Sequence, residues 1–394
     1  MGVAGKHFPS HGHDAPGNDA PGAVAQSSQP AAASDERIRK ESFFGHVLNR
    51  PEFAAISGTV LVFLVFAISA GSSGMFNLDG VMNWSQVSAY LGILAVGACL
   101  LMIAGEFDLS VGSMIGFAGV VIGMLVSEAG WPIPLAVLAA FVVAICVGWA
   151  NGWLVIKTGL PSFIVTLASM FILRGLTLAL TRLVTNRTQI PYITNDHEND
   201  FIVQLFSGHL GNGIFVWLAH HGYIAQRSDG APFVDGIPVA IFWWLGLAAV
   251  ATWILVRTRF GNWIFASGGD ANAARNVGVP VARVKISLFI MTAVVSTIFA
   301  CVQVFSTGSA DTLRGTQKEF EAIIAAVIGG NLLSGGYGSA IGAVFGALIF
   351  GMVEIGIFYT GVDTDWFKVF LGVMVLIAVL FNDFIRRRAT EARK

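Results

Sequence analysis

The sequence predicts an all-α, polytopic membrane protein with about ten transmembrane helices. The first observation is composition: of 394 residues, 55% are apolar and only 12% are charged, whereas about 25% of residues are charged in an ordinary soluble domain. The second is the length of the apolar runs, most of which approach the ~20 residues that a helix needs to cross a bilayer. These runs lack the strict alternation of β-barrel strands. A net charge of −1 provides no basic field for nucleic acid.

The apolar runs place the expected membrane helices in order along the chain. They are 54–70, 87–104, 111–127, 133–156, 161–181, 239–256, 286–304, 320–333, 338–357 and 366–384. The run 320–333 is short, which predicts a broken or half helix there. The 46 glycines agree with membrane helices, in which small residues let neighbouring backbones approach closely.

Basic residues predict the orientation, because loops rich in lysine and arginine stay in the cytoplasm. Four of them precede the first span: Arg37, Arg39, Lys40 and Arg50. With ten spans, Lys157, the connection from Arg257 to Lys285 and the segment after Arg386 fall on the same side. We therefore expect both termini in the cytoplasm.

Three regions are expected along the chain. Residues 1–50 form a cytoplasmic tail and a basic pre-membrane segment; most of this tail lacks an apolar period and is rich in Gly, Pro, Ala and Ser, which predicts disorder. It also lacks the apolar core of a cleaved signal peptide. Residues 51–385 form the transmembrane domain, with an external region at 182–238 and a cytoplasmic loop at 257–285. Residues 386–394 form a basic cytoplasmic tail.

Signatures of catalysis and of metal or cofactor binding are not found in the sequence. It contains no GxxxxGK[ST] nucleotide-binding loop and no HExxH or GxSxG motif, so we predict no catalytic, cofactor or metal site. ATP-driven work would need an ATPase on another chain.

Cys99, Cys146 and Cys301 stand alone in apolar runs and are interpreted as small buried hydrophobes. The pair His220 and His221 suggests metal binding, but no ligand spacing accompanies it.

The cytoplasmic loop 257–285 is too polar and glycine-rich to cross lipid, and it predicts a short helix. Asp270 is placed to cap a helix that begins near Ala271, and Gly278 to end it. Good helix formers occupy its turns: Ala273, Ala274 and Arg275. Such a helix suits a mechanical joint, with Ala273 and Ala274 as the face that enters a groove on a partner. The alternative is a basic loop that only fixes the topology.

Polar side chains inside apolar runs are candidates for a translocation path or gate, because they are costly in lipid. The candidates are Glu106, Asp108, Asn151, Ser162, Thr166 and Glu354. Asp108 has a structural alternative, which is to cap the following helix near Ser110. Hydrogen bonds between helices are the alternative for the others. Arg174 is expected near the outer interface, reached by snorkelling.

The stretch Gly105-Glu106-Phe107-Asp108-Leu109-Ser110-Val111-Gly112-Ser113 resembles the G-x-[IF]-D-L-S-V-G-S signature of ribose/xylose-type sugar ABC importer permeases. Further blocks of that family follow in order: Asn151-Gly152, Pro161 to Leu167, Arg174-Gly175, Gly261 to Asp270, Ala273 to Arg275, Gly278-Val279, Glu319 to Ile323, Val327 to Gly330 and Leu333 to Ser339. The resemblance covers about 55–181 and 239–385. Two positions depart from the pattern, since Asp270 stands where Asn is usual and Asn331-Leu332 where Thr-Ser is usual.

The resemblance implies the permease subunit of an ATP-driven importer in the bacterial inner membrane, for a monosaccharide or related polyol. It implies a homodimer, an ABC ATPase subunit as one partner and a periplasmic sugar-binding protein as another. The residues implied to couple to the ATPase are Gly261, Ala266, Gly268, Asp270, Ala273, Ala274, Arg275 and Gly278. Which sugar is carried stays open, as does the role of 182–238. The alternatives are a stand-alone secondary transporter and a related permease for amino acids or nucleosides.

An internal echo accompanies these motifs. Leu109 to Gly116 resembles Leu333 to Gly342, with two extra residues in the second copy. Both copies follow an apolar span and open a glycine-rich one, in the same predicted orientation. The echo therefore predicts a parallel repeat; the alternative is chance, because Gly, Ser and Leu are common.

Overall fold

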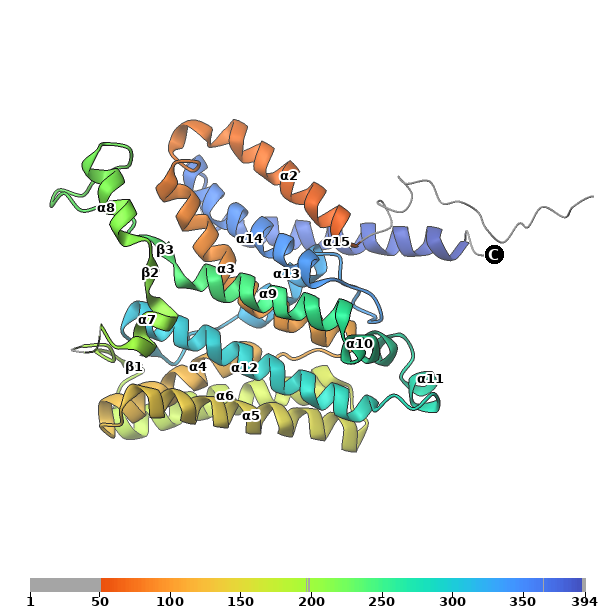
Figure 1. Cartoon of the computed structure of the whole chain (residues 1–394). Helices are drawn as coiled ribbons and strands as arrows, with labels where there is room; N and C mark the ends of the chain where they lie inside the picture. Colours follow the sequence, from red (N-terminus) through yellow and green to blue (C-terminus); the bar gives the residue numbers. More distant parts are fainter. Residues whose placement is uncertain (1–50, 196, 198, 364, 392–394) are drawn as a thin grey trace, which may run out of the picture. The chain divides into compact units, whose positions relative to one another are not determined.

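The structure is a computed structural model that describes residues 51–391 apart from 196, 198 and 364. The predicted disordered tail and basic segment in 1–50, and the last three residues of the basic C-terminal tail, lie outside the described residues. The described part is a bundle of long helices with two very short antiparallel strand pairs (Figure 1). The predicted all-α membrane fold is confirmed.

The long helices run back and forth between two ends of the bundle (Figure 1). They are α2 (Pro51–Ser69), α3 (Leu78–Ile103), α4 (Val111–Gly123, continued by a π-helical turn at Met124–Glu128), α5 (Ile133–Thr158), α6 (Ser162–Thr185), α9 (Val239–Arg257), α12 (Val281–Thr307), α14 (Ala340–Thr360) and α15 (Trp366–Glu391). Helix α15 continues through most of the segment predicted as a basic tail. Within the described residues, 8 helices are long and apolar enough to cross a membrane.

Two predicted spans differ from these 8 helices. The run 320–333 folds as α13 (Lys318–Ile328), whose 11 residues rise only about 16 Å and cannot cross a bilayer. The short helix predicted there is therefore observed. The last predicted run, 366–384, lies within α15, and the part of it that the structure describes includes the apolar stretch Trp366–Ile377.

Proline and glycine set many of the helix boundaries. Proline precedes α5, α6, α9 and α12, where its missing N–H removes no helical hydrogen bond. Glycine ends α5, α12 and α14 in the left-handed conformation that other residues avoid. The ends of these helices are therefore specified locally by the sequence.

Burial divides the bundle into central and peripheral helices. Helices α3 and α12 are mostly buried, whereas most residues of α2, α5, α6 and α9 are not buried inside the chain. On α2, for example, Leu61 is 63% and Ile68 is 88% exposed. Helices that are apolar on exposed faces are unfavourable in water and expected in a bilayer. The burial pattern therefore supports a membrane environment.

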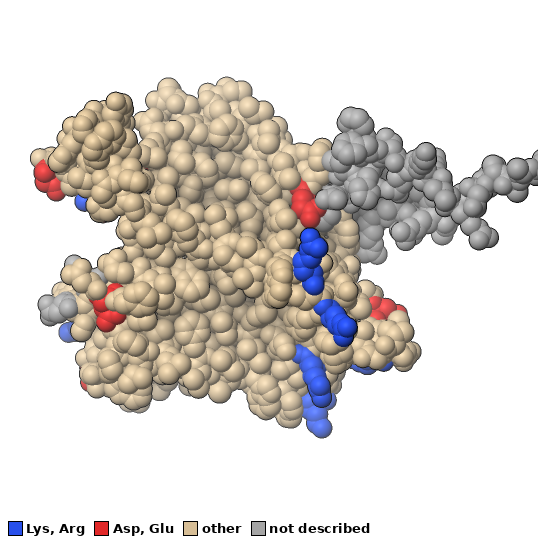
Figure 2. Space-filling model, in the orientation of Figure 1, with Lys and Arg blue, Asp and Glu red and all other residues tan. Residues whose placement is uncertain are grey.

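The two ends of the bundle differ in structure and charge. One end has α7 (Phe201–Ser207), α8 (Asn212–His220) and two antiparallel strand pairs, β1 (Gln189–Ile190) with β4 (Ala310–Asp311) and β2 (His209–Leu210) with β3 (Ile237–Pro238). The other end has α10 (Arg259–Gly269) and α11 (Ala271–Asn276). Basic side chains line this second end (Figure 2), where Lys157 and Arg257 occupy the last turns of α5 and α9.

Candidate functional site

The chain between α3 and α4 is not helical, although it is enclosed by other helices. Residues 104–110 form turns and extended backbone. The N–H of Phe107 donates to Ser162 Oγ at 3.0 Å, and the N–H of Leu109 donates to Thr166 Oγ1 at 3.0 Å. Irregular backbone at membrane depth is tolerated only where its polar groups find such partners. The first turns of α6 therefore hold this break in place.

Asp108 lies at the centre of a buried hydrogen-bond network beside the break. Its carboxylate accepts from the N–H of Ser110 at 2.9 Å, the hydroxyl of Ser110 at 2.5 Å and the hydroxyl of Thr292 at 2.8 Å. Asn151 Nδ2 donates to the Ser110 hydroxyl at 3.0 Å. The network joins α4, α5 and α12. The bond to the N–H of Ser110 is the local capping contact that the sequence suggested, and the role in a gate stays a prediction.

Glu106 forms a buried ion pair with Lys285 of α12. The side chains are only 12% and 11% exposed, respectively. The sequence indicates Lys285 only as one of the basic loop residues, without a partner. The two residues are 179 positions apart, so no local pattern connects them.

A second ion pair joins α6 to the start of α13. Arg174 Nη2 lies 2.8 Å from Glu319 Oε1, and the Glu319 side chain is 1% exposed. Arg174 follows the start of α6 by 12 residues, a rise of about 18 Å, so it lies near mid-helix. The expectation that Arg174 snorkels to an interface was wrong, because a buried carboxylate holds it. Glu319 entered the sequence analysis only as part of a motif.

Helix α4 and the short helix α13 meet at their N-terminal ends. A Cβ atom on Gly112 of α4 would overlap the Glu319 carboxylate and would lie 2.5 Å from Gly315 O. The second carboxylate oxygen of Glu319, Oε2, has no hydrogen-bond partner among the described residues. Gly112 therefore permits the close approach of these two helix starts.

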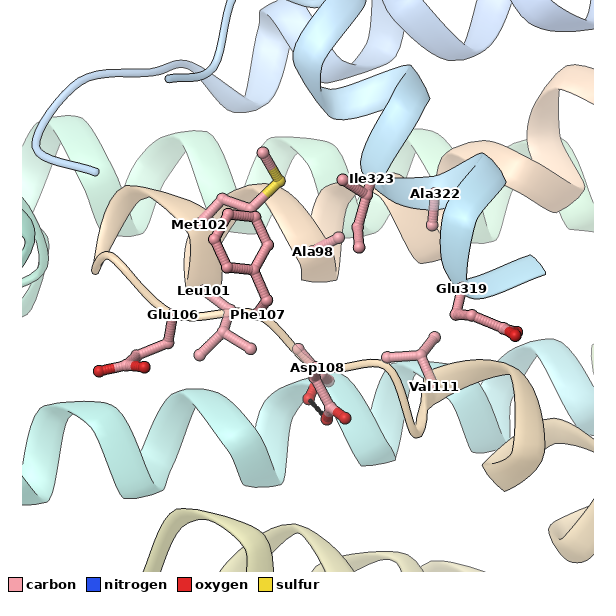
Figure 3. A pocket seen from close by; sticks show the side chains of 11 residues that line it. Ala98, Leu101, Met102, Glu106, Phe107, Asp108, Val111, Glu319, Ala322 and Ile323 are labelled. Atoms are coloured by element: carbon pink, nitrogen blue, oxygen red, sulfur yellow. Dashed lines mark hydrogen bonds between the residues drawn. The ribbon is translucent and has the colours of Figure 1, made fainter. Parts of the chain in front are cut away.

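A narrow cavity of about 10 Å³ lies between the break and α13 (Figure 3). Met102, Phe107 and Asp108 line it from the end of α3 and the break, and Glu319 lines it from α13. That volume accommodates about one water molecule. Of the residues predicted for a path or gate, Glu106 and Asp108 line this cavity.

The structure brings together most of the candidates for the path. Glu106, Asp108 and Ser110 belong to the break, and three neighbours bind it from other helices: Asn151, Ser162 and Thr166. Glu354 on α14 lies outside this network. Its Oε2 atom has no hydrogen-bond partner among the described residues, and its charged neighbours are Lys318 and Glu321.

The predicted short helix of the 257–285 loop is present as α11. Asp270 caps it by accepting from the N–H groups of Asn272 at 2.8 Å and Ala273 at 3.0 Å. Hydrogen bonds from Ala273 first, and then from Asn272, lower the pKa of Asp270. A lowered carboxyl pKa means that the cap is present at neutral pH and is lost only as the pH falls through that pKa. Gly278 follows the helix with a φ of +86°.

One detail of the predicted partner face was wrong. Ala274 is 4% exposed and packs inside the chain, so it is not presented to a partner. Helical periodicity turns Ala273 outward instead, next to Val277, which is 80% exposed. A second helix, α10, precedes α11 and contains Gly261, Ala266 and Gly268. Gly261 is buried against the carbonyls of α9.

The structure combines membrane-length helices, a broken segment with buried polar side chains and a short capped helix at one end. These features together are those of a helical membrane transport protein. Residues 80–379 match the family described as branched-chain amino acid transport system / permease component, and the chain belongs to this family. It is therefore a permease component.

Curated relatives agree with the predicted resemblance to sugar permeases. The xylose transport system permease protein XylH of Escherichia coli K12 is 30% identical over 87% of this chain and 94% of its own length. The ribose import permease protein RbsC of the same strain is 30% identical over 82% of this chain and 91% of its own length. The fructose import permease protein FrcC of Rhizobium meliloti is 28% identical over 93% and 95%, respectively. No solved structure matches significantly.

Proposed function

We propose that this chain is the membrane-spanning subunit of an ATP-driven importer for a monosaccharide or related polyol. The observation that carries the proposal is the 30% identity to a xylose permease over most of both chains. The family description names branched-chain amino acids, whereas the relatives XylH, RbsC and FrcC are named for xylose, ribose and fructose. These three relatives favour a sugar as the cargo.

The buried charges favour an ATP-driven importer over a stand-alone secondary transporter. A secondary transporter needs ionisable groups that take up and release a coupling proton or ion. Glu106 and Glu319 are instead each paired with a basic residue, and Asp108 is fixed by three hydrogen bonds, which leaves Glu354 of α14 as a described carboxylate that could serve such coupling. Glu106, Asp108 and Glu319 are well suited to hold the helices around the break in place.

The energy source in this proposal is an ABC ATPase on a separate chain, because the sequence contains no nucleotide-binding loop. Helix α11 is proposed as the element that docks on it. Its outer surface has the small side chain of Ala273 and the exposed apolar side chain of Val277. Basic side chains lie at the same end of the bundle (Figure 2). The positive-inside rule assigns this end, and with it both termini, to the cytoplasm. A periplasmic sugar-binding protein would deliver cargo to the opposite end, in a homodimer of this permease.

Reconstitution tests this proposal. In proteoliposomes, uptake of xylose, ribose or fructose is expected only when the permease, its ATPase and its binding protein are all present with ATP. A proton uncoupler should leave uptake unchanged at constant ATP, and the permease alone should hydrolyse no ATP. Uptake that collapses with the proton gradient at constant ATP would instead identify a secondary transporter.

A charged residue on the outer surface of α11 should prevent docking. Val277→Glu places an unpaired charge where a partner would bury it, so ATPase recovered with the permease is expected to fall about tenfold or more. Co-purification in detergent measures this loss. Leu160→Glu is the matched control, because it adds the same charge at the same end in an exposed position outside α11. Equal recovery with both variants would show that α11 is not the docking element.

A further inference from the structure

Three segments meet backbone to backbone beside the end of α10. They are the break after α3, the last turn of α10 and the loop 331–339 before α14. The N–H of Gly336 donates to the carbonyl of Ile103 at 2.8 Å. A Cβ atom on Gly268 would overlap that same carbonyl and would lie 2.7 Å from Gly336 N. The contact therefore leaves no room for a side chain at Gly268.

The loop residues in this contact are also restricted to glycine. Gly335 has a φ of +78°, and a Cβ atom there would lie 2.7 Å from Gly105 Cα and 2.9 Å from Gly268 O. Gly336 has a φ of +77°, and its Cβ would lie 2.9 Å from Gly269 Cα. Side chains are unfavourable in this backbone conformation as well as in this space. We call Gly105, Gly268, Gly335 and Gly336 the glycine junction.

The loop on the far side of the junction is firmly attached to its neighbours. Asn331 is fully buried; its Nδ2 donates to Ala326 O at 2.7 Å, and its Oδ1 accepts from the N–H of Ser339 at 2.9 Å. Cys99 of α3 donates to the same oxygen at 3.2 Å. Closely packed segments of this kind transmit displacement because they have no free volume to absorb it.

We propose that the glycine junction transmits movement of α10 and α11 to the broken segment 104–110. A displacement of α10 presses directly on the Ile103 carbonyl and on Gly105, which adjoins Glu106. The same displacement reaches α13 through the anchored loop, so both walls of the closed cavity respond together. The proposal rests on the proposed function, since the ATPase must act on α11.

The junction also gives a role to the internal echo of the sequence. The first copy follows Gly105, and the two extra residues of the second copy fall within Gly335 to Tyr337. Gly335 and Gly336 are therefore part of the feature that distinguishes the two copies, and they make the contact with α10 and the break.

Two neighbouring glycines of α10 provide the test. Gly268→Ala inserts a methyl group into the junction, whereas a Cβ atom at Gly269 meets nothing within 4 Å. Both changes replace a helical glycine by alanine, so their effect on helix propensity is similar. Gly268→Ala is expected to lower ATP-driven sugar uptake about tenfold or more, and Gly269→Ala less than about twofold. Both variants should retain the ATPase on co-purification. The complex of Gly268→Ala with the ATPase should still hydrolyse ATP, but this hydrolysis should no longer drive import.

Uptake by Gly268→Ala equal to that of Gly269→Ala would overturn the proposal. A wild-type complex that fails to import sugar would be a failure of the proposed function, so the two failures are distinguishable. If Gly268→Ala does not fold, hydrogen exchange on the wild-type complex decides the question. Nucleotide binding to the ATPase is then expected to change amide exchange in 104–110 and 333–338 together with α10 and α11. A change confined to α10 and α11 would contradict transmission through the junction.

Discussion

Replacing Lys285 by methionine is expected to destabilise the chain strongly, because it leaves the Glu106 carboxylate buried without its partner. Removing one member of a buried ion pair costs about 3–5 kcal/mol. The thermal unfolding midpoint of the purified permease in detergent should fall accordingly. The double variant Glu106→Gln with Lys285→Met should recover much of the loss, because no unpaired charge remains.

Lys157→Met is the control for this experiment. It removes the same charge at the same end of the bundle, from an exposed position in the last turn of α5. Its unfolding midpoint should stay close to that of the wild type. A Lys285→Met variant as stable as Lys157→Met would mean that the pair with Glu106 contributes little to holding α12 against the break.

The second large effect is expected at Arg174. Arg174→Leu leaves the Glu319 carboxyl group buried without its partner, next to the helix starts of α4 and α13, and should cost about 3 kcal/mol or more. Sugar uptake should fall in parallel, because Glu319 lines the cavity beside the break. Thermal unfolding and uptake by proteoliposomes measure the two effects.

The matched control and the double variant make this result specific. Arg182→Leu removes an exposed arginine from the same helix and should change neither stability nor uptake appreciably. Arg174→Leu combined with Glu319→Leu should regain stability, since the uncompensated charge is gone. If the double variant is no more stable than Arg174→Leu alone, burial of an unpaired carboxylate is not the cause of the loss.

These two ion pairs suggest how the break is maintained. Glu106 connects it to α12, and Glu319 connects the start of α13 to α6. Further hydrogen bonds hold the break between these two ion pairs. Asp108 accepts from the hydroxyl of Thr292, and a hydroxyl of α6 accepts from the backbone of the break. Movement at the break therefore requires several buried polar contacts to change together, which is the behaviour of an element with discrete arrangements.

The class of fold and several local features could be predicted from the sequence. Apolar run length determined the membrane helices, and the short run near α13 indicated its incomplete span. Asp270, Ala271 and Gly278 specified the position and both ends of α11. Each of these features depends on residues a few positions apart, so a local pattern contains the necessary information.

Only the tertiary structure decided which polar residues meet. Glu106 and Lys285 are 179 positions apart, and Arg174 and Glu319 are 145 apart, so their pairing depends on how three helices pack around the break. The burial of Ala274 and the outward position of Ala273 depend likewise on the helices beneath α11. The contacts of Gly268 with Ile103 and Gly336 join three distant segments. The sequence by itself thus determined a membrane permease with a short capped helix in the loop 257–285, because helix formation and capping are local, whereas packing alone assembled the polar site.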